Sequence, residues 1–205
     1  MLNVIEELIL DINELHINFH SNGDNQIKHH INFSKRQINH LYIENKLSND
    51  FFSYVTAYKH AMARLMNSKD ADDLIDNYNS LRLRMRIKEW SSLEEKIERH
   101  NNGPTEGKIP IQKCINDIFG LRIISDKDYR NHKDFDQMCE RLKKEKVIFR
   151  YYTRNDDEYH GIHLYFKGKS NLYLPWELQI WYDEHEENNY QSHHQHKQGY
   201  LKRGE

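Results

Sequence analysis

Strict alternation of apolar and basic residues in one segment constrains the fold of this 205-residue chain more than any other feature. Residues 81–88 read LRLRMRIK, so every second side chain is apolar and each one between is arginine or lysine. A period of two is the period of a β-strand, whose successive side chains point to opposite faces of the sheet. The segment therefore predicts a strand with one apolar face and one cationic face.

A helix is predicted directly after this strand. Residues 91–100 (SSLEEKIERH) open with Ser91 and Ser92, each followed three residues later by a glutamate, as in a capping box. Gly103 and Pro104 are expected to end the helix. The strand thus leads into a helix N-terminus, where free backbone N–H groups and the helix dipole favour an anion such as phosphate.

The cationic strand face has two interpretations. Like charges side by side on a strand destabilise it unless water or an anion neutralises them. The segment is either a polyphosphate cradle, built from Arg86, Lys88, Ser92 and Lys96, or a solvated edge strand whose basic residues prevent aggregation. The physical argument alone gives the two interpretations equal weight.

Helices are predicted before this strand, and strands mixed with helices after it. Apolar spacing indicates helices within residues 1–80, among them 48–66 and 70–79, with a polar loop at 21–30. Further strands are expected at 111–125, 146–152, 161–168 and 171–181, and the last two are expected to pair as a hairpin. Polar helices are expected at 133–145 and 183–198. The pattern predicts an α+β fold with about four or five strands, divided into a helical N-terminal extension (1–80) and a second domain (81–205).

Composition excludes several classes of protein. The net charge is −2, so any basic binding site must be local. No apolar stretch is long enough to cross a bilayer, and the N-terminus lacks the pattern of a signal peptide. The two cysteines, Cys114 and Cys139, build neither a disulfide framework nor a zinc knuckle. We expect a reduced, cytoplasmic protein with no membrane partner.

Two acidic residues are expected inside apolar strands. Asp117 lies in INDIFGLRII and Glu177 in LPWELQIW, and a carboxylate in such a position needs a partner or a metal. On neighbouring strands the two would form a Mg²⁺ site for phosphate chemistry, whereas each alone is better explained by pairing with an arginine. Gln179 has the parity of Glu177 and faces the same side. Arg122 has the parity opposite to that of Asp117, unless Gly120 marks a bulge that resets the alternation.

Two further features carry weaker signals. Tyr159, beside Gly161 and before His163, could offer its ring for base stacking, or be an ordinary turn aromatic. The tail holds His185, His193, His194 and His196, but their spacing matches no standard zinc pattern, so a solvated helix is the better interpretation.

Taken in order, these motifs resemble the synthetase domain of RelA/SpoT homologues, and the lone domain resembles a small alarmone synthetase. The resemblance covers about residues 82–197. It rests on four motifs with the family's spacing: Arg86, Lys88, Ser92 and Lys96; Asp117, Gly120 and Arg122; Tyr159, Gly161 and His163; Glu177, Gln179 and Ile180.

The resemblance implies a fold, a reaction and a role for each residue. The fold would be a nucleotidyltransferase-like mixed sheet. The reaction would move the β,γ-pyrophosphate of ATP to the 3′-hydroxyl of GDP or GTP, giving (p)ppGpp and AMP. ATP and its phosphates would contact Arg86, Lys88, Ser92, Lys96 and Arg122. Asp117 would hold Mg²⁺; Glu177 would share the metal or act as base; Tyr159, His163 and Gln179 would lie on the acceptor side.

The chain departs from the family pattern on the acceptor side. His160 stands where the family often has arginine after the tyrosine, and Trp181 and Tyr182 stand where it usually has Arg-Thr. These departures keep open a toxin branch, which resembles the family but modifies the 3′ end of tRNA or an adenine nucleotide and is neutralised by an antitoxin. An inactive nucleotide-binding module is a further alternative, which is disfavoured because both acidic residues are present. A homo-oligomer stays open as a partner state for each of these functions.

Overall fold

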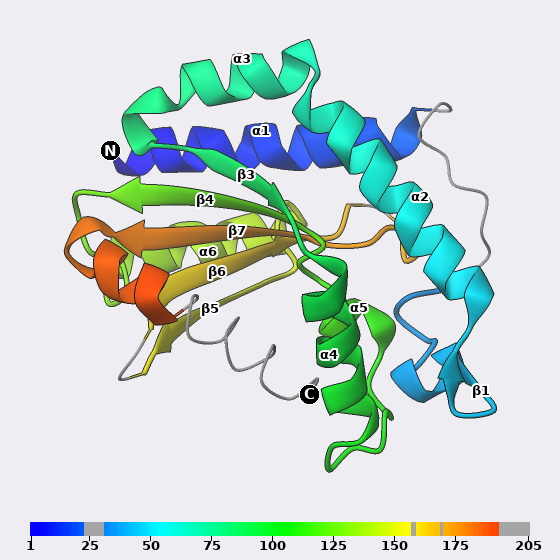
Figure 1. The fold of residues 1–205 in the computed structure, drawn as a ribbon. Coiled ribbons are helices and arrows are strands. Elements are labelled where there is room, and N and C mark those ends of the chain that lie inside the picture. The colour runs from blue at the N-terminus through cyan, green and yellow to red at the C-terminus, as the bar shows by residue number, and fades with distance from the viewer. Residues whose placement is uncertain (23–30, 157–158, 169, 193–205) are drawn as a thin grey trace.

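The computed structural model describes residues 1–22, 31–156, 159–168 and 170–192. In these ranges five strands form the main sheet in the order β3-β4-β7-β6-β5 (Figure 1). β4 and β7 run parallel and the other neighbours are antiparallel. The strands are β3 (Arg84–Ile87), β4 (Phe119–Ser125), β5 (Arg150–Asn155), β6 (His160–Phe166) and β7 (Trp176–Tyr182). The predicted α+β class with a mixed sheet of about five strands, and the antiparallel pairing of the last two strands, are confirmed.

Helices precede the sheet and connect its strands. They are α1 (Leu2–Ser21), α2 (Asn49–Met66), α3 (Lys69–Asn77), α4 (Trp90–Asn101), α5 (Ile111–Cys114) and α6 (Lys133–Lys144). A hairpin of β1 (Tyr42–Ile43) and β2 (Lys46–Leu47), which the sequence did not predict, lies before α2. The four helices predicted at 48–66, 70–79, 91–100 and 133–145 are confirmed to within two residues at each end.

One face of the sheet is polar. Residues that pair across strands share a face, and two adjacent rows of paired residues carry the side chains singled out in the sequence. The first row runs from β3 to β6 through Arg86, Gly120, Glu177 and Tyr165, and the second runs from β3 to β5 through Arg84, Arg122, Gln179, His163 and Tyr152.

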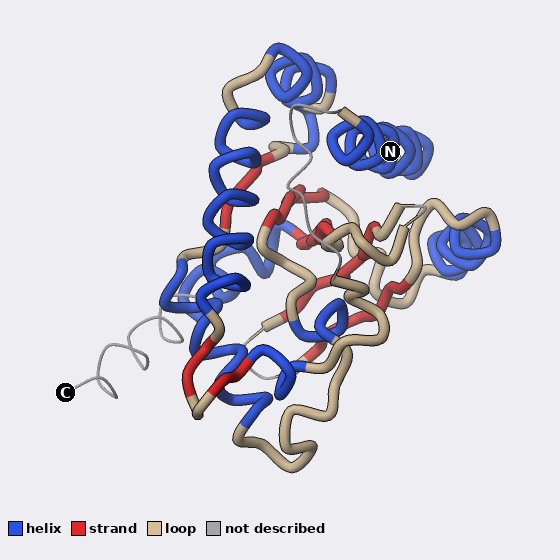
Figure 2. The backbone as a smooth tube through the Cα atoms, turned by 90° about the vertical axis from the view of Figure 1, so that its right-hand side faces the viewer, coloured by secondary structure: helices blue, strands red, loops and turns tan. Residues whose placement is uncertain are grey.

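The opposite face of the sheet is apolar and buried. Leu121 and Ile123 of β4 and Leu178 and Ile180 of β7 point to this face and are at most 3% exposed. α1 and α6 lie against it, as Figures 1 and 2 show from two directions. The buried residues of α1, α2 and this face belong to one hydrophobic core, which fixes the sheet and leaves its polar face for a site. The boundary predicted between residues 80 and 81 stays a prediction.

Two strands begin later than predicted because left-handed residues precede them. The strand predicted at 81–88 begins at Arg84, because Arg82 has φ 51° and ends a short 3₁₀ turn. The strand predicted at 146–152 begins at Arg150, after Lys146 with φ 64°. These turns break the extended backbone that alternation alone implied.

Three other boundaries differ for local reasons. Residues 111–114 are helical rather than extended, because Ile111, Cys114 and Ile115 are buried at helical spacing. Asp117 consequently lies in the loop before β4, not within a strand. The last strand begins at Trp176 rather than 171, since Pro175 lacks the N–H that a strand pairing requires.

The ends of two predicted segments lie partly outside the described residues. In the predicted helix 183–198, residues 183–185 form a 3₁₀ turn and 186–192 are helical, and 193–198 lie outside the description. The loop predicted at 21–30 falls almost wholly on residues 23–30, which are not described either. No helix in the described ranges has both the length and the apolar character that a membrane crossing requires.

Candidate active site

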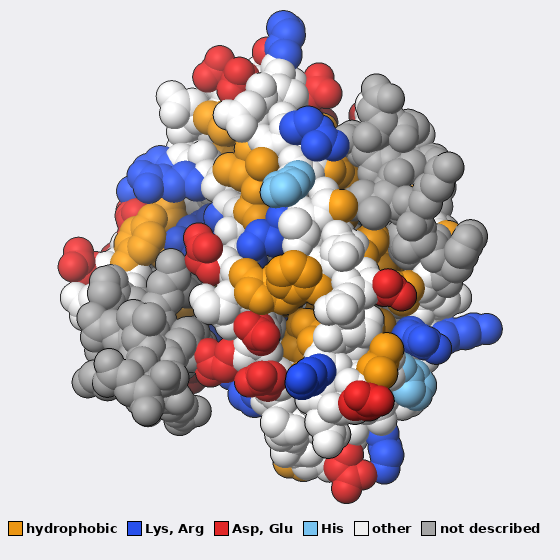
Figure 3. Space-filling model, turned by 45° about the vertical axis from the view of Figure 1, so that its right-hand side comes forward, with side chains coloured by type: hydrophobic (Ala, Val, Ile, Leu, Met, Phe, Trp, Pro, Cys, Tyr) orange, Lys and Arg blue, Asp and Glu red, His pale blue; other side chains and the backbone are white. Residues whose placement is uncertain are grey.

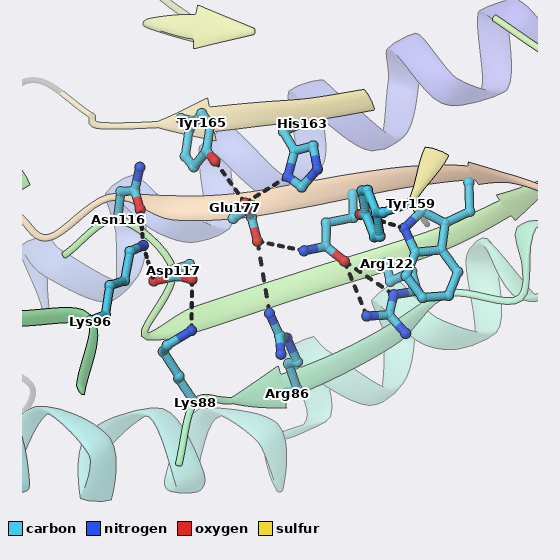
Figure 4. A network of polar contacts seen from close by, with 12 residues as sticks. Arg86, Lys88, Lys96, Asn116, Asp117, Arg122, Tyr159, His163, Tyr165 and Glu177 are labelled. Carbon is cyan, nitrogen blue, oxygen red and sulfur yellow. Dashed lines mark hydrogen bonds and ion pairs between the residues drawn. The ribbon is translucent and has the colours of Figure 1, made fainter. Parts of the chain in front are cut away.

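A cavity of about 520 Å³ lies over the polar face of the sheet, within the size range of small-ligand sites. Strands β3, β7, β6 and β5, the helix α4 and the loop before β4 supply its walls. Every predicted site residue except Arg122 lines it: Arg86, Lys88, Ser92, Lys96, Asp117, Tyr159, His163, Glu177 and Gln179. Figure 4 shows how the side chains of its polar network converge.

Asp117 lies between two lysines. Its two carboxylate oxygens each accept from an ammonium group, Lys88 Nζ at 3.0 Å and Lys96 Nζ at 3.0 Å. Lys96 also donates to the Asn116 side-chain oxygen at 3.0 Å. Burial by itself would raise the pKa of Asp117, but the two ammonium groups outweigh it and hold that pKa well below its usual value. The predicted carboxylate is therefore ionised and brings two cations to the cavity.

Glu177 is the second buried carboxylate, 3% exposed on β7. Its Oε1 accepts from Tyr165 Oη at 2.8 Å and lies 2.9 Å from His163 Nδ1. Its Oε2 accepts from Gln179 Nε2 at 2.8 Å. Burial opposes ionisation, yet the contacts to His163 and Tyr165 lower the pKa of Glu177 to about 2. Three side chains of the polar face thus orient one ionised carboxylate.

Arg86 reaches Glu177 across a glycine. Arg86 pairs with Gly120 on β4, and Gly120 pairs with Glu177 on β7. A Cβ at position 120 would lie 3.2 Å from Arg86 Nε, so the missing side chain leaves room for the guanidinium to cross β4. Arg86 Nη2 then lies 3.9 Å from Glu177 Oε2. The strands pair without interruption at Gly120, so the bulge considered for this position is not present.

The helix α4 brings Ser92 and Lys96 to the cavity from one side. It begins at Trp90, with Glu89 as N-cap residue and no side-chain capping bond, so the predicted capping box of Ser91 or Ser92 is wrong. Lys88 follows β3 and donates its backbone N–H to the Ile118 carbonyl at 2.8 Å, which continues the register of β3 and β4 by one residue before the helix begins. The first turn of the helix, uncapped by a side chain, lies at the cavity rim.

Arg122 lies beside the cavity rather than in its lining. Its Nε and Nη2 donate to Gln179 Oε1 at 3.2 and 3.1 Å, and its guanidinium lies 3.5 Å from the Trp181 ring centroid. Gln179 therefore bridges Arg122 and Glu177. Of the basic residues predicted to contact phosphate, the structure brings Arg86, Lys88 and Lys96 together and leaves Arg122 behind this amide.

Tyr159 and His163 form the opposite wall. Tyr159 is 2% exposed; its hydroxyl accepts from Trp181 Nε1 at 2.8 Å, and Arg154 lies 4.8 Å from its ring centroid. His163 stacks on Tyr152 with ring centroids 4.9 Å apart. The Tyr159 ring at the cavity is therefore buried and partly covered by Arg154. The sequence analysis expected a ring in a loop that is open for stacking.

The cavity has seven lining residues that the sequence interpretation missed: Ile87, Glu89, Glu95, Arg99, Tyr152, Arg154 and Tyr165. Arg99 follows Lys96 by three residues and shares its helix face. Tyr165 has the parity of His163 on β6, and Arg154 has the parity of Tyr152 on β5. Strand parity and helical spacing therefore indicated that these residues share a face with the predicted ones. Placing the strand residues at the cavity also required knowing which strands are neighbours.

The donor chemistry of the cavity fits a magnesium ion. Asp117 and Glu177 are ionised oxygen donors that both line it. Among the described residues no group of three or more histidines, cysteines or acidic residues forms a metal cage. Mg²⁺ is usually held by one or two carboxylates together with substrate phosphates, so two carboxylates suffice. Of the tail histidines, His185 contacts Arg130, and the other three lie outside the described residues.

Comparisons with known proteins identify the family. A family model described as "Region found in RelA / SpoT proteins" matches residues 85–203, more than half of the chain. No curated protein gives a significant match.

Two solved structures from Bacillus subtilis are similar to this chain. One is small alarmone synthetase 2, with 20% identity and a TM-score of 0.45 over 77% of this chain and 84% of that one. The other is small alarmone synthetase 1, with 18% identity and a TM-score of 0.43 over 77% of this chain and 83% of that one. On the match to the family model, which spans the whole described site, the chain belongs to the RelA/SpoT family and is an enzyme of the pyrophosphotransferase type.

Proposed function

We propose that this enzyme transfers the β,γ-pyrophosphate of ATP to the 3′-hydroxyl of GDP or GTP, giving AMP and (p)ppGpp. One observation carries the proposal: a single cavity brings four cations of β3, α4 and the turn between them, which outnumber Glu89 and Glu95 of the same wall, next to a buried, ionised carboxylate. Pyrophosphoryl transfer requires charge neutralisation and in-line positioning more than covalent catalysis, and this combination supplies both.

The cationic wall would bind the triphosphate of ATP. Lys88 and Lys96 are held by Asp117, and Arg86 by Glu177, so their charges are fixed before substrate arrives. Fixed charges need no reorganisation as charge develops on the transferred group. Arg99 adds a further cation on the same helix face as Lys96. In this proposal the phosphates bind between β3 and α4, and Ser92 contacts them at the uncapped helix N-terminus.

Glu177 would accept the proton of the acceptor hydroxyl. The O3′–Pβ bond forms while the bond from Pβ to the Pα–Pβ bridging oxygen breaks, and AMP leaves with that oxygen. Glu177 Oε1 has two partners, whereas Oε2 accepts from Gln179 alone at hydrogen-bonding distance. A carboxylate oxygen can accept two hydrogen bonds, so Oε2 has room for the 3′-hydroxyl. With its low pKa, Glu177 takes the proton only as the attacking oxygen bonds to phosphorus.

Magnesium would be held by Asp117 together with phosphate oxygens, and Glu177 would share the ion as the alternative to its role as base. The ion would supply neutralisation of the charge on the transferred pyrophosphate. The acceptor nucleotide would lie along Tyr159, Tyr152 and Arg154, with His163 and Gln179 keeping Glu177 oriented. Arg154 supports this placement, because it brings to the acceptor wall a cation that neither His160 nor Trp181 provides.

The 3′-terminal adenosine of tRNA, or a free adenine nucleotide, is the second candidate acceptor. Its support is that the two positions where the family carries arginine bring no cation to this wall, since His160 bonds to Asn155 and Trp181 is fully buried. In this alternative the enzyme would block translation and would have a protein antitoxin as partner. A cytoplasmic location and a homo-oligomer remain part of the proposal for either acceptor.

One radiolabel assay separates these functions. ATP labelled at the γ-phosphate is incubated with Mg²⁺, enzyme and either GDP, GTP, AMP, ADP, ATP or deacylated tRNA. Label on GDP or GTP with equimolar AMP is expected. Label on tRNA or an adenine nucleotide alone would replace the proposed acceptor with the second candidate. The Glu177→Gln variant is the inactive control, and the Glu14→Gln variant, changed at an exposed glutamate of α1, is the matched active one.

A further inference from the structure

A second cavity, of about 330 Å³, lies on the other side of α4. The hairpin β1–β2, the beginning of α2 and the outer side of α4 form its walls. It shares no lining residue with the cavity over the polar face of the sheet, which we call the nucleotide cavity. Its lining residues are Tyr42, Asn45, Lys46, Leu47, Asn49, Phe52, Trp90, Glu94, Ile97 and Glu98. We call it the hairpin pocket.

Aromatic rings that are open to solvent form part of the hairpin pocket. Phe52 is 45% exposed and meets the half-buried Trp90 edge to face, with ring centroids 4.4 Å apart. Ile43, on the hairpin beside the pocket, is 65% exposed. Figure 3 shows hydrophobic side chains gathered on this face of the molecule, with acidic side chains next to them. Exposed apolar groups gathered in this way mark an interaction site.

Two carboxylates at the pocket have no partner among the described residues. Glu94 and Glu98 lie one turn apart on α4; both are exposed, and neither forms an ion pair or hydrogen bond there. Burial and then the charges of Glu98 and Glu94 raise the pKa of Tyr42 to about 12, so their negative potential reaches the pocket wall. Lys46 contributes one positive charge to the lining against these two negative ones.

We propose that the hairpin pocket binds an arginine side chain of a partner polypeptide. A guanidinium is planar, stacks on aromatic faces and donates in a fork to carboxylates, and the pocket supplies both kinds of group. A neutral apolar group would leave the two carboxylates without a cation, and a nucleic acid would be repelled by them. Ile43, beside the pocket, and Phe52, in its lining, are exposed and would contact the residues on either side of the arginine.

The position of the pocket keeps this binding apart from catalysis. Trp90, Glu94 and Glu98 point to one side of α4, while Ser92 and Lys96 of the same helix point to the nucleotide cavity. A partner can therefore dock at the hairpin pocket while the nucleotide cavity stays open. The proposal does not depend on the reaction, and it is tested without nucleotide.

The test titrates ¹⁵N-labelled enzyme with N-acetyl-arginine methylamide and follows the tryptophan indole N–H signals. The chain has three tryptophans. Trp176 and Trp181 are fully buried and donate to Tyr58 and Tyr159, so Trp90 is the reporter, assigned with the variant Trp90→Phe. We expect a saturable shift of the Trp90 signal with a dissociation constant in the millimolar range. The uncharged citrulline analogue should give no saturable shift.

Matched variants decide whether the two carboxylates bind the probe. The double variant Glu94→Gln/Glu98→Gln should weaken binding of the arginine probe at least fivefold. The variant Glu44→Gln, changed at an exposed hairpin residue outside the pocket lining, should bind like the unaltered enzyme. An equal response to the citrulline analogue, unchanged affinity in the double variant, or no saturable shift of Trp90 would each overturn the proposal.

Discussion

The two faces of the sheet are built from the same strands, yet they serve opposite purposes. On β7, Glu177 and Gln179 point to the polar face, whereas Leu178 and Ile180 point to the core. All four side chains are buried, at most 4% exposed. Burial therefore does not separate the faces; what separates them is whether each buried group meets a hydrogen-bonding partner or an apolar one.

This comparison teaches how a buried carboxylate is fixed in place. The apolar face packs on α1 and α6 and makes the strands rigid. On the polar face every second residue can then be set within hydrogen-bonding distance of its neighbours, as with His163 and Tyr165 around Glu177. Changes on one face should thus affect chemistry, and changes on the other should affect stability.

The largest expected effect is on the polar face. The variant Glu177→Gln removes the carboxylate but retains its size, and we expect pyrophosphate transfer to fall by about a thousandfold or more. The melting temperature, measured by circular dichroism, should stay within a few degrees of that of the unaltered enzyme. Substantial remaining transfer would show that Glu177 is not the proton acceptor, and a collapse in stability would break the separation of the faces.

The next effect belongs to the apolar face. Leu178 is fully buried beside Glu177, and the variant Leu178→Ala should lower the free energy of unfolding by about 3 kcal/mol through the lost burial and the cavity left behind. Denaturant titration measures this loss. The folded fraction should still bind ATP with unchanged affinity, so a matching loss of ATP affinity would contradict the comparison.

The sequence predicted the faces because period two is a local property. Alternation at 81–88 and the apolar flanks of Glu177 sufficed to place Arg86 and Glu177 on strand faces, and all but one of the residues in the family motifs that were predicted as site residues line one cavity. Local pattern does not report which strands are neighbours. The order β3-β4-β7-β6-β5 brings Tyr165 to Glu177 and Arg154 to Tyr159, and no sequence period contains that order.

Backbone turns were the second source of error. Left-handed residues at Arg82 and Lys146 precede β3 and β5 and delay the start of extended structure within the segments predicted as strands. Arginine and lysine carry no signal for this conformation, unlike glycine, so neither position was recognisable. The position of Asp117 in a loop depended likewise on the short helix α5, which buries Ile111 and Cys114. At α5 the burial of these two side chains, a tertiary contact, decided the local structure.

A buried histidine on the core side of the sheet is expected to make stability depend on pH. His16 of α1 is fully buried, lies 3.0 Å from the Leu174 carbonyl through Nε2, and contacts the edge of Trp176. Burial lowers the pKa of His16 from 6.5 to about 4. Between these values the unfolded chain binds the proton and the folded one does not, so stability falls as the pH falls.

We expect His16 to remove about 2 kcal/mol of unfolding free energy between pH 7 and pH 5. The other histidines contribute to the total, so the measurement is a difference: denaturant titrations of the unaltered enzyme and of His16→Gln at both values of pH. The variant should lose less stability on acidification by this amount. Parallel losses in the two proteins would show that His16 is protonated in the folded state or solvated there.

The smallest expected effect sharpens the comparison within the polar face itself. Arg84 and Lys88 both belong to the cationic pattern, but only Lys88, which follows β3, lines the nucleotide cavity, where it holds Asp117; Arg84 is exposed on β3. The variant Lys88→Ala should weaken ATP binding about tenfold, since it removes one fixed charge from the cationic wall. Arg84→Ala should leave the dissociation constant unchanged, because an exposed charge is screened by water and salt. Isothermal titration of ATP with both variants measures the difference.

Equal losses would mean that the strand attracts ATP by its overall charge, as an edge strand with a solvated basic face would. A loss confined to Lys88 would mean that position toward the cavity, and not basic character, selects the residues that bind phosphate.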